Sequence, residues 1–296
     1  MFAVLGPTAA GKSEVAMRLA EREGATILSV DSMQVYRGMD IGTAKPSPED
    51  RARVPHEMID LCDPDEEFSV AEFQSRARAV IGSVEGDVII VGGSGLHFRA
   101  VVDPMVFDQT DPVLRSALEG RPLDSVRAEL LGSDPRAGDH VDLANPRRVV
   151  RALEVLLLTG RSPSRRAADP RRRDVAEYRP SIPFRAVGID PGDASGARIA
   201  GRLGEMRSRG LLDEVRALRS RLGRTASQAV GYKELVAVVD GRVAEDEGFE
   251  AVRVATEALV KRQRTFFRPD PRIAWIDWTD SVDDVTARAA SELELV

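Results

Sequence analysis

The sequence contains one cysteine, Cys62, and no apolar run that approaches the roughly 18 residues needed to cross a bilayer. A single thiol excludes both an internal disulfide framework and a thiolate metal cluster. The apolar start MFAVLG lacks the basic leader of a signal peptide, and we expect it to form a first strand. These absences predict a protein that does not enter membranes and works in a reducing, cytoplasmic setting.

Lysine is scarce, and acidic residues outnumber basic ones, which gives a net charge of −6. This balance argues mildly against a nucleic-acid partner. The average hides an uneven distribution, however, because residues 147–173 hold nine arginines against Glu154 and Asp169. Local basic surface, and not net charge, sets the attraction to phosphate backbones. A nucleic-acid partner therefore stays possible for this segment.

Short apolar runs with the pattern of buried strands recur along the chain, at residues 1–6, 25–31, 87–93, 184–190 and 273–278. Amphipathic helical patterns alternate with them, and one of these helices is expected to begin at a capping box of Ser69 and Glu72. Alternating strands and helices favour a parallel sheet that is covered on both faces.

Between residues 108 and 182 the strand pattern stops, and short helices broken by Gly and Pro are expected, followed by a polar, basic loop at 161–174. The sequence thus predicts an α/β fold: a P-loop NTPase-like parallel sheet flanked by helices, with a helical insertion domain. We expect the core domain at 1–107 and 183–296 and the insertion at 108–182.

The octapeptide GPTAAGKS matches the phosphate-loop pattern G-x-x-x-x-G-K-[ST] through Gly6, Gly11, Lys12 and Ser13. In such a loop, backbone N–H groups converge on phosphate oxygens, and the positive end of the following helix lies behind them. The lysine adds a full charge, and the hydroxyl of Ser13 can be a ligand of Mg²⁺. A polyphosphate ligand is expected, but the loop alone does not specify which one.

Asp31 lies at the carboxyl end of the second expected strand. An ordinary ATPase or kinase needs an apolar strand that ends in Asp to hold the magnesium hydration shell, yet the strand at 87–93 ends in glycines. Asp31 can therefore be a magnesium-site carboxylate, a catalytic base, or a residue that caps the next turn. The long polar segment at 33–46 suits the binding of a second substrate.

Several longer blocks are more specific than the phosphate loop. They are GPTAAGKS, VDSMQVYRGMDIGTAKP, VPHEMIDLCDP, FSVAEF, IVGGSGLHFRA, NPRRVVRALEV, TGRS, AVGYKEL and KRQRTFFR, and they cover nearly the whole chain. In content and in order they resemble the tRNA dimethylallyltransferases, which modify the adenosine beside the anticodon.

This resemblance implies transfer of a dimethylallyl group from dimethylallyl diphosphate to the exocyclic amine of that adenosine, giving N6-isopentenyladenosine. It implies Asp31 as the general base and Arg202 as a group that stabilises the leaving diphosphate, with Mg²⁺ held through Ser13. The residues implied in diphosphate binding are Gly6, Thr8, Ala9, Ala10, Gly11, Lys12 and Ser13. We expect the protein to act as a monomer.

The resemblance also implies a set of tRNA contacts. The target base must leave its stack to be reached, at a cost of a few kcal/mol. The residues implied in contact with the RNA are Asp31, Ser32, Met33, Gln34, Ser94, Arg115, Arg147, Arg148, Arg151, Gly231, Tyr232 and Lys233. Three of these arginines, Arg147, Arg148 and Arg151, are spaced to share one helical face and could hold phosphates.

Three other functions remain open on the sequence alone. Prenyl transfer to free adenine nucleotides would use the same loop, but it would not need the arginine row or the AVGYKEL segment. A P-loop kinase of a small metabolite would turn over ATP. An RNA-binding module with a vestigial nucleotide site is disfavoured by the intact phosphate loop and by Asp31.

Overall fold

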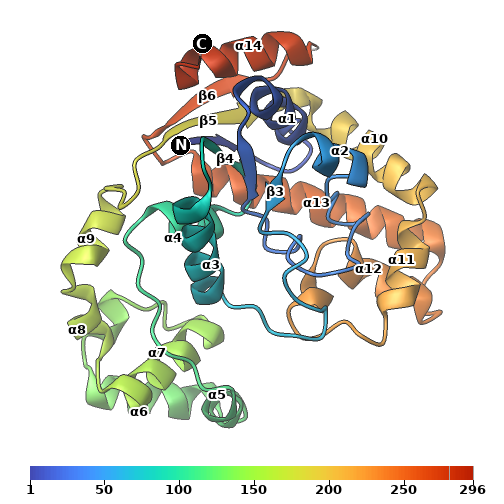
Figure 1. Cartoon of the computed structure of the whole chain (residues 1–296). Coiled ribbons are helices and arrows are strands. Elements are labelled where there is room, and N and C mark those ends of the chain that lie inside the picture. Colours follow the sequence, from blue (N-terminus) through green and yellow to red (C-terminus); the bar gives the residue numbers. More distant parts are fainter. Residues whose placement is uncertain (280, 296) are drawn as a thin grey trace. The chain divides into compact units, whose positions relative to one another are not determined.

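The structure is a computed structural model that describes residues 1–279 and 281–295. The chain divides into two compact units, one formed by Met1–Val102 with Ile182–Val296 and the other by Asp103–Ser181 (Figure 1). The boundaries expected from the sequence are 108 and 182. None of the described helices is long and apolar enough to cross a bilayer.

The first unit contains a six-stranded sheet in the order β3-β2-β4-β1-β5-β6, and all neighbouring strands are parallel. The strands are β1 (Phe2–Leu5), β2 (Thr26–Ser29), β3 (His56–Glu57), β4 (Val88–Gly92), β5 (Arg185–Asp190) and β6 (Ile273–Asp277). This arrangement confirms the predicted parallel α/β fold. No strand is expected at β3 from the sequence, because two residues are too few to show strand periodicity.

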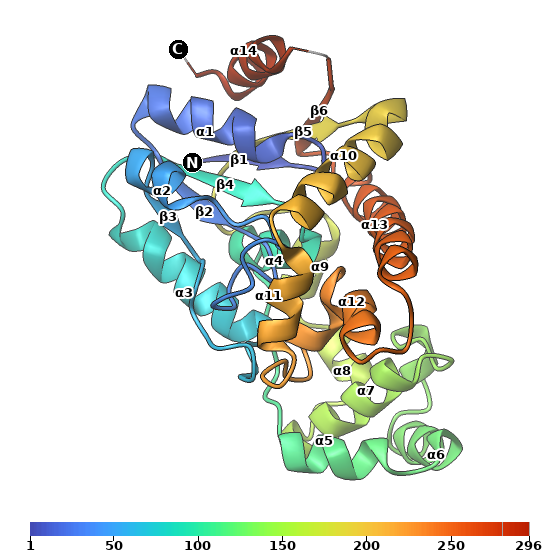
Figure 2. The ribbon, with the colours of Figure 1, turned by 90° about the vertical axis from the view of Figure 1, so that its right-hand side faces the viewer.

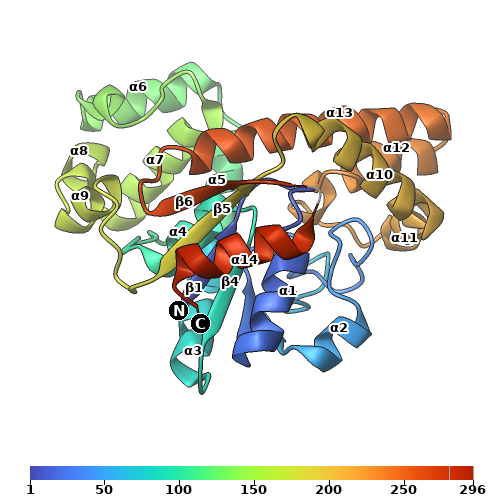
Figure 3. The same ribbon diagram turned by 90° about the horizontal axis from the view of Figure 1, so that it is seen from above.

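The sheet is buried on both faces, since successive side chains of a strand point to opposite sides. In β4, Val88 and Ile90 belong to one apolar core, whereas Ile89 and Val91 belong to another. The second core is completed by α1 (Lys12–Glu23) and α14 (Val282–Leu293), which Figures 2 and 3 show on the same side of the sheet.

The helices that contribute to the first core come from two parts of the chain. They are α3 (Val70–Ser83), α4 (Gly95–Val102), α11 (Leu211–Leu218), α12 (Tyr232–Val239) and α13 (Glu245–Phe267). The short α2 (Pro48–Arg53) lies between β2 and β3 in the chain, and α10 (Ser195–Ser208) follows β5. Short 3₁₀ turns are η1 (Ala137–Asp139), η2 (Gly192–Ala194) and η3 (Ala226–Gln228).

The expected capping box of α3 is formed only in part. The Oγ of Ser69 accepts a hydrogen bond from the backbone N–H of Glu72 at 3.1 Å. The Glu72 carboxylate does not return to the cap, and pairs instead with Arg76 at 2.9 Å. An arginine one turn further along offers that carboxylate a stronger, charged partner than a backbone N–H.

The second unit is helical, with α5 (Pro112–Glu119), α6 (Leu123–Ser133), α7 (Pro146–Thr159), α8 (Pro163–Ala167) and α9 (Pro170–Ala176). The prediction of a loop at 161–174 is wrong, because α8 and α9 occupy most of it. Both α8 and α9 start with a proline at the first helical position, and a capping residue comes before it, Ser162 in α8 and Asp169 in α9. Proline is tolerated at that position because its missing N–H would have no helical partner.

Candidate functional site

The candidate site lies at the carboxyl ends of β1, β2 and β4, which are neighbours in the sheet. The phosphate loop follows β1, Asp31 follows β2, and Ser94 comes directly after the glycines that end β4. Ligands of open parallel sheets bind at this edge, where loops from adjacent strands converge. Three segments far apart in the sequence therefore meet at one place.

The two glycines of the phosphate loop are required by close packing. A Cβ added to Gly6 would lie 2.4 Å from the carbonyl oxygen of Ile189. At Gly11, φ is +85°, and a Cβ would lie 2.2 Å from the ring of Trp278. Glycine is therefore required at these two positions, because the loop backbone packs there against β5 and against the ring of Trp278.

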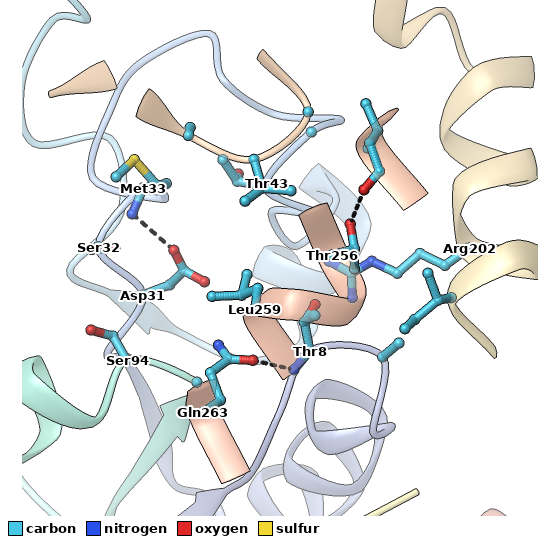
Figure 4. Close-up of a pocket in the computed structure, with 18 of the residues that line it drawn as sticks. Thr8, Asp31, Ser32, Met33, Thr43, Ser94, Arg202, Thr256, Leu259 and Gln263 are labelled. Carbon is cyan, nitrogen blue, oxygen red and sulfur yellow. Dashed lines mark hydrogen bonds between the residues drawn. The ribbon is translucent and has the colours of Figure 1, made fainter. Parts of the chain in front are cut away.

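The start of α1 presents backbone donors to a ligand. Within the described chain, the N–H groups of Ala10, Gly11, Lys12 and Ser13 make no hydrogen bond. Free N–H groups and the helix dipole together attract a phosphate. Thr8 differs from the other loop residues, because its N–H already donates to Oε1 of Gln263 at 2.8 Å (Figure 4).

Lys12 lies inside the loop, with its side chain buried and its Nζ donating to the carbonyl oxygen of Pro7 at 2.6 Å. Burial and the nearby Arg202 lower the pKa of Lys12 to about 7, although the Asp31 carboxylate opposes this shift. The ammonium group is therefore partly deprotonated at neutral pH until an anionic ligand stabilises its charge.

We expect diphosphate binding to weaken as the pH rises above about 7, by up to tenfold per pH unit for one linked proton. The pKa of Lys12 in the free protein is about 7. A diphosphate beside the ammonium group would raise it, so the protonated form would bind more tightly. Calorimetric titration with dimethylallyl diphosphate over this range measures the slope.

Lys12→Arg is the control for this titration, because arginine stays charged throughout the range. In Lys12→Arg, the part of the pH dependence of affinity that comes from Lys12 should disappear. The part that comes from ionisation of the diphosphate itself should stay. An identical slope in the two proteins would show that Lys12 does not titrate in the free site.

Asp31 uses one carboxylate oxygen to hold the turn that follows β2. Its Oδ1 accepts a hydrogen bond from the N–H of Met33 at 2.8 Å (Figure 4). The other oxygen has no hydrogen-bond partner among residues 1–279 and 281–295. Asp31 thus serves as a turn cap and still keeps an acceptor for a substrate proton.

Arg202 projects from α10 towards the same place. Burial lowers the pKa of Arg202, whereas the negative charge of Asp31 raises it, which places the two groups within electrostatic reach. Across the part of the chain that the structure describes, Arg202 makes no hydrogen bond or ion pair. A half-buried cation without a hydrogen-bond or ion-pair partner is suited to an anionic ligand.

Two cavities, each of 320 Å³, meet at these residues. The phosphate cavity includes Lys12, Ser13 and Ser29 in its lining, and the apolar cavity includes Ile199, Leu203, Met206, Leu211, Val252 and Leu259. The residues that line both cavities are Thr8, Asp31, Thr43, Gly93, Arg202 and Gln263. Figure 4 shows labelled members of this shared junction. A ligand can therefore place its phosphates on one side of Asp31 and its apolar part on the other.

Five of the residues implied in RNA binding line the apolar cavity: Asp31, Ser32, Met33, Ser94 and Gly231. The Oγ of Ser94 is hydrogen-bonded to Nδ1 of His97 at 2.7 Å. Burial lowers the pKa of His97 to about 4, against the attraction of Asp31. His97 is therefore neutral at physiological pH and orients the Ser94 hydroxyl.

Gln34 and Tyr232 are engaged within the protein. The Gln34 side chain accepts from Ser29 Oγ at 2.8 Å and donates to the carbonyl oxygens of Thr43 and Ala44. Tyr232 is fully buried. Its ring is therefore not available to stack on a base, whereas the neighbouring Lys233 is exposed.

The arginines of the second unit that are implied in RNA binding fall into two groups, one bound to a buried carboxylate and one exposed. Arg115 and Arg151 both bind the carboxylate of Glu154, which has no exposed surface, at 2.8 and 2.9 Å. Burial alone would raise the pKa of Glu154, but these hydrogen bonds outweigh it and hold the pKa below its ordinary value. Arg147 and Arg148 are exposed and, in the described residues, make no side-chain hydrogen bond.

Of the three arginines expected to share one phosphate-binding face, only Arg147 and Arg148 have side chains without a hydrogen bond among the described residues. Helical spacing put Arg151 beside them, but the buried carboxylate on the next turn takes its guanidinium. Arg151 also donates to the carbonyl oxygens of Asp108 and Gln109, which further fixes it inside the unit.

We expect Arg151→Ala to lower the free energy of unfolding by about 3 kcal/mol, because it leaves the buried Glu154 carboxylate with one arginine fewer. Arg148→Ala should change stability by less than about 0.5 kcal/mol. It should nevertheless weaken tRNA binding and reduce the salt dependence of binding by about one charge. Urea denaturation and binding titrations at several salt concentrations measure both effects. Equal stability of the two variants would mean that Arg151 is free to bind RNA.

The donors at the phosphate cavity suit a magnesium ion held mainly by a substrate. The Ser13 hydroxyl is exposed at the start of α1, and Asp31 offers one unengaged oxygen in the same lining. Among the described residues there is no cluster of three or more His, Cys, Asp or Glu side chains that could hold a metal alone. Mg²⁺ commonly binds through few protein ligands and completes its shell with phosphate oxygens and water.

Sequence reasoning assigned no role to Gln263 or Thr43, although both lie at the junction of the two cavities. Gln263 comes from α13 and reaches the phosphate loop across 255 residues of sequence. Both residues fall within blocks that carry the family resemblance, KRQRTFFR and VDSMQVYRGMDIGTAKP, so the sequence marks both segments. It does not show which atoms these two side chains contact.

Comparisons with known proteins agree with the geometry. The IPP transferase family model matches residues 34–270. The tRNA dimethylallyltransferase of Pseudarthrobacter chlorophenolicus is 42% identical over 301 residues, covering 98% of this chain and 97% of that protein.

Solved structures give the same result. The full-length tRNA isopentenylpyrophosphate transferase of Bacillus halodurans matches with a TM-score of 0.69 and 34% identity, covering 99% of this chain and 96% of that one. A eukaryotic dimethylallyltransferase acting on tRNA matches with a TM-score of 0.80, covering 98% of this chain and 77% of that one. At 23% identity, this last likeness concerns the fold alone.

Proposed function

The chain belongs to the IPP transferase family, and on that premise we propose that it is a tRNA dimethylallyltransferase. It transfers the dimethylallyl group of dimethylallyl diphosphate to the exocyclic amine of the adenosine next to the anticodon. The observation that carries this proposal is the junction of the two cavities, where Asp31 and Arg202 line both the phosphate side and the apolar side.

The phosphate side suits the donor. The diphosphate would lie against the free N–H groups of Ala10 to Ser13, with Lys12 beside it and Mg²⁺ held through Ser13. Bound Mg²⁺ supplies positive charge to the leaving diphosphate. Arg202, which has no anionic partner of its own, adds a fixed charge where negative charge develops on the bridging oxygen.

The apolar side suits the prenyl group and the acceptor base. An adenine amine is a poor nucleophile, because its lone pair is delocalised into the ring. The free oxygen of Asp31 can accept the proton that the amine loses as the new carbon–nitrogen bond forms. Ser94, oriented by His97, offers a hydroxyl to the base edge from the same cavity.

The arrangement favours RNA over a free nucleotide as the acceptor. Arg147, Arg148 and Lys233 are exposed cations without an internal partner in the described chain, and a mononucleotide would not need them. We propose that they contact tRNA phosphates, and that Arg115, Arg151, Gln34 and Tyr232 support the binding surface from within. We also propose that the protein is a monomer and that it works in the cytoplasm.

The test incubates the purified protein with Mg²⁺, radiolabelled dimethylallyl diphosphate and unmodified tRNA, and in parallel reactions with AMP or ATP in place of tRNA. Label on the tRNA adenosine supports the proposal. Label on the mononucleotide alone would assign the protein to the sister activity. ATP hydrolysis without prenyl transfer would make it a P-loop kinase.

A further inference from the structure

A second carboxylate, Glu214 of α11, binds a loop of the site across more than 170 residues of sequence. Its Oε2 accepts hydrogen bonds from the backbone N–H groups of Asp40 at 2.9 Å and Ile41 at 2.7 Å. Its Oε1 accepts from the N–H of Gly42 at 3.0 Å and from the hydroxyl of Tyr232 at 2.5 Å. One carboxylate thus receives four donors, which satisfies the acceptor capacity of both oxygens.

Three consecutive backbone N–H groups that converge on one point form an anion-binding concavity. Here the anion is a side chain of the same protein. The other edge of this loop is held by Gln34, whose amide donates to the carbonyl oxygens of Thr43 at 3.1 Å and Ala44 at 3.2 Å. The loop at 39–44 has no helix or strand of its own. Besides the turn bonds from the N–H of Ala44 to Ile41 and from the hydroxyl of Thr43 to Met39, these two side chains hold it to the rest of the unit.

The loop forms part of the junction. Gly42 lines the apolar cavity, and Thr43 lines both cavities. A Cβ on Gly42 would lie 2.4 Å from the ring of Tyr232, so the loop backbone packs directly on that ring. Gly231, the residue before Tyr232, lines the same cavity. Glu214 therefore fixes two walls of the apolar cavity relative to each other.

We propose that Glu214 is a positioning residue for prenyl transfer, which holds the loop at 39–44 so that Thr43 stands at the junction beside Asp31. This inference rests on the proposed function. Glu214 itself lines neither cavity. It acts through the loop on the acceptor side and makes no hydrogen bond to the phosphate loop.

The test removes the carboxylate and then supplies one from solution. Glu214→Ala leaves the three N–H groups of the concavity empty. We expect kcat for tRNA prenylation to fall by about 10²-fold, as for a misplacement of about 1 Å, while the affinity for dimethylallyl diphosphate stays unchanged. Sodium acetate should restore part of kcat, whereas sodium chloride at equal ionic strength should not.

Glu247→Ala is the matched control. This carboxylate also accepts a backbone N–H, from Ala244 at 3.3 Å, but it lies outside both cavity linings. Glu247→Ala should lose one hydrogen bond from a backbone N–H and keep the wild-type kcat. A general loss of stability in Glu214→Ala would not be reversed by acetate, which separates a positioning role from a merely structural one.

Amide hydrogen exchange tests the clamp without using activity. The amides of Asp40, Ile41 and Gly42 should be protected in the wild-type protein, exposed in Glu214→Ala, and protected again by acetate. Unprotected amides in the wild type, or an unchanged kcat in Glu214→Ala, would overturn the inference. If the wild type transfers no prenyl group to tRNA, the proposed function fails and the positioning role fails with it, whatever the exchange pattern shows.

Discussion

Asp31→Asn is expected to lower kcat for prenyl transfer to tRNA by about 10²–10⁴-fold, the range typical of a lost general base. The asparagine keeps an oxygen that can accept the N–H of Met33, so the turn after β2 should persist. What disappears is the negative charge and the ability to accept the proton from the adenine amine. Single-turnover kinetics with labelled dimethylallyl diphosphate measure this chemical step directly.

The substitution has a second, smaller consequence. Asp31 raises the pKa of Lys12 and of Arg202, so its loss makes both cations harder to protonate. Diphosphate binding should therefore be measured separately, at a pH well below 7, so that Lys12 is protonated in the variant as well as in the wild type. A fall in kcat with retained diphosphate affinity assigns the effect to the base.

Asp87→Asn is a suitable control, because Asp87 is an exposed carboxylate just before β4, at the opposite end of the strands. It should leave kcat unchanged. If Asp31→Asn also kept the wild-type kcat, Asp31 would not be the base, and the departing diphosphate would be the remaining acceptor for the proton.

The phosphate loop and Asp31 could be located from sequence because their determinants are local. Eight consecutive residues define the loop, and the strand before it has a clear apolar pattern. The structure adds the reason for the glycine spacing, which is contact with Ile189 and Trp278. These neighbours are more than 180 residues away in the sequence, so the reason could not be derived from the motif.

Long-range polar contacts were the principal omission. Gln263 reaches Thr8, and Glu214 reaches the loop at 39–44, without any pattern in the sequence that links them. A glutamate or glutamine on an amphipathic helix normally belongs to the solvated face. Only the fold reveals which of these side chains is directed to a backbone N–H of the site.

The arginines of the second unit show a related limit. Periodicity correctly places Arg147, Arg148 and Arg151 on one helix, α7. It does not show that Glu154 on the same helix is buried, and the need to neutralise that carboxylate decides which arginine is engaged. The same applies to α8 and α9, where the capping residues Ser162 and Asp169 outweigh the polar composition that suggested a loop.

The second large effect is expected at Arg202. Arg202→Gln should lower kcat by about 10²–10³-fold, the cost of removing one preorganised group that stabilises developing charge. The KM for dimethylallyl diphosphate should change much less, because Lys12 and the free N–H groups of the phosphate loop still bind the ground state. Steady-state kinetics on tRNA separate the two parameters.

Arg209→Gln provides the matched control, since Arg209 is an exposed arginine at the end of the same helix and lies outside both cavity linings. It should behave as the wild type. Arg202→Lys should recover part of kcat, because it restores the charge without the planar guanidinium. A raised KM with an unchanged kcat in Arg202→Gln would instead mean that Arg202 binds the diphosphate equally well before and during bond breakage, and the charge at the junction would then serve binding alone.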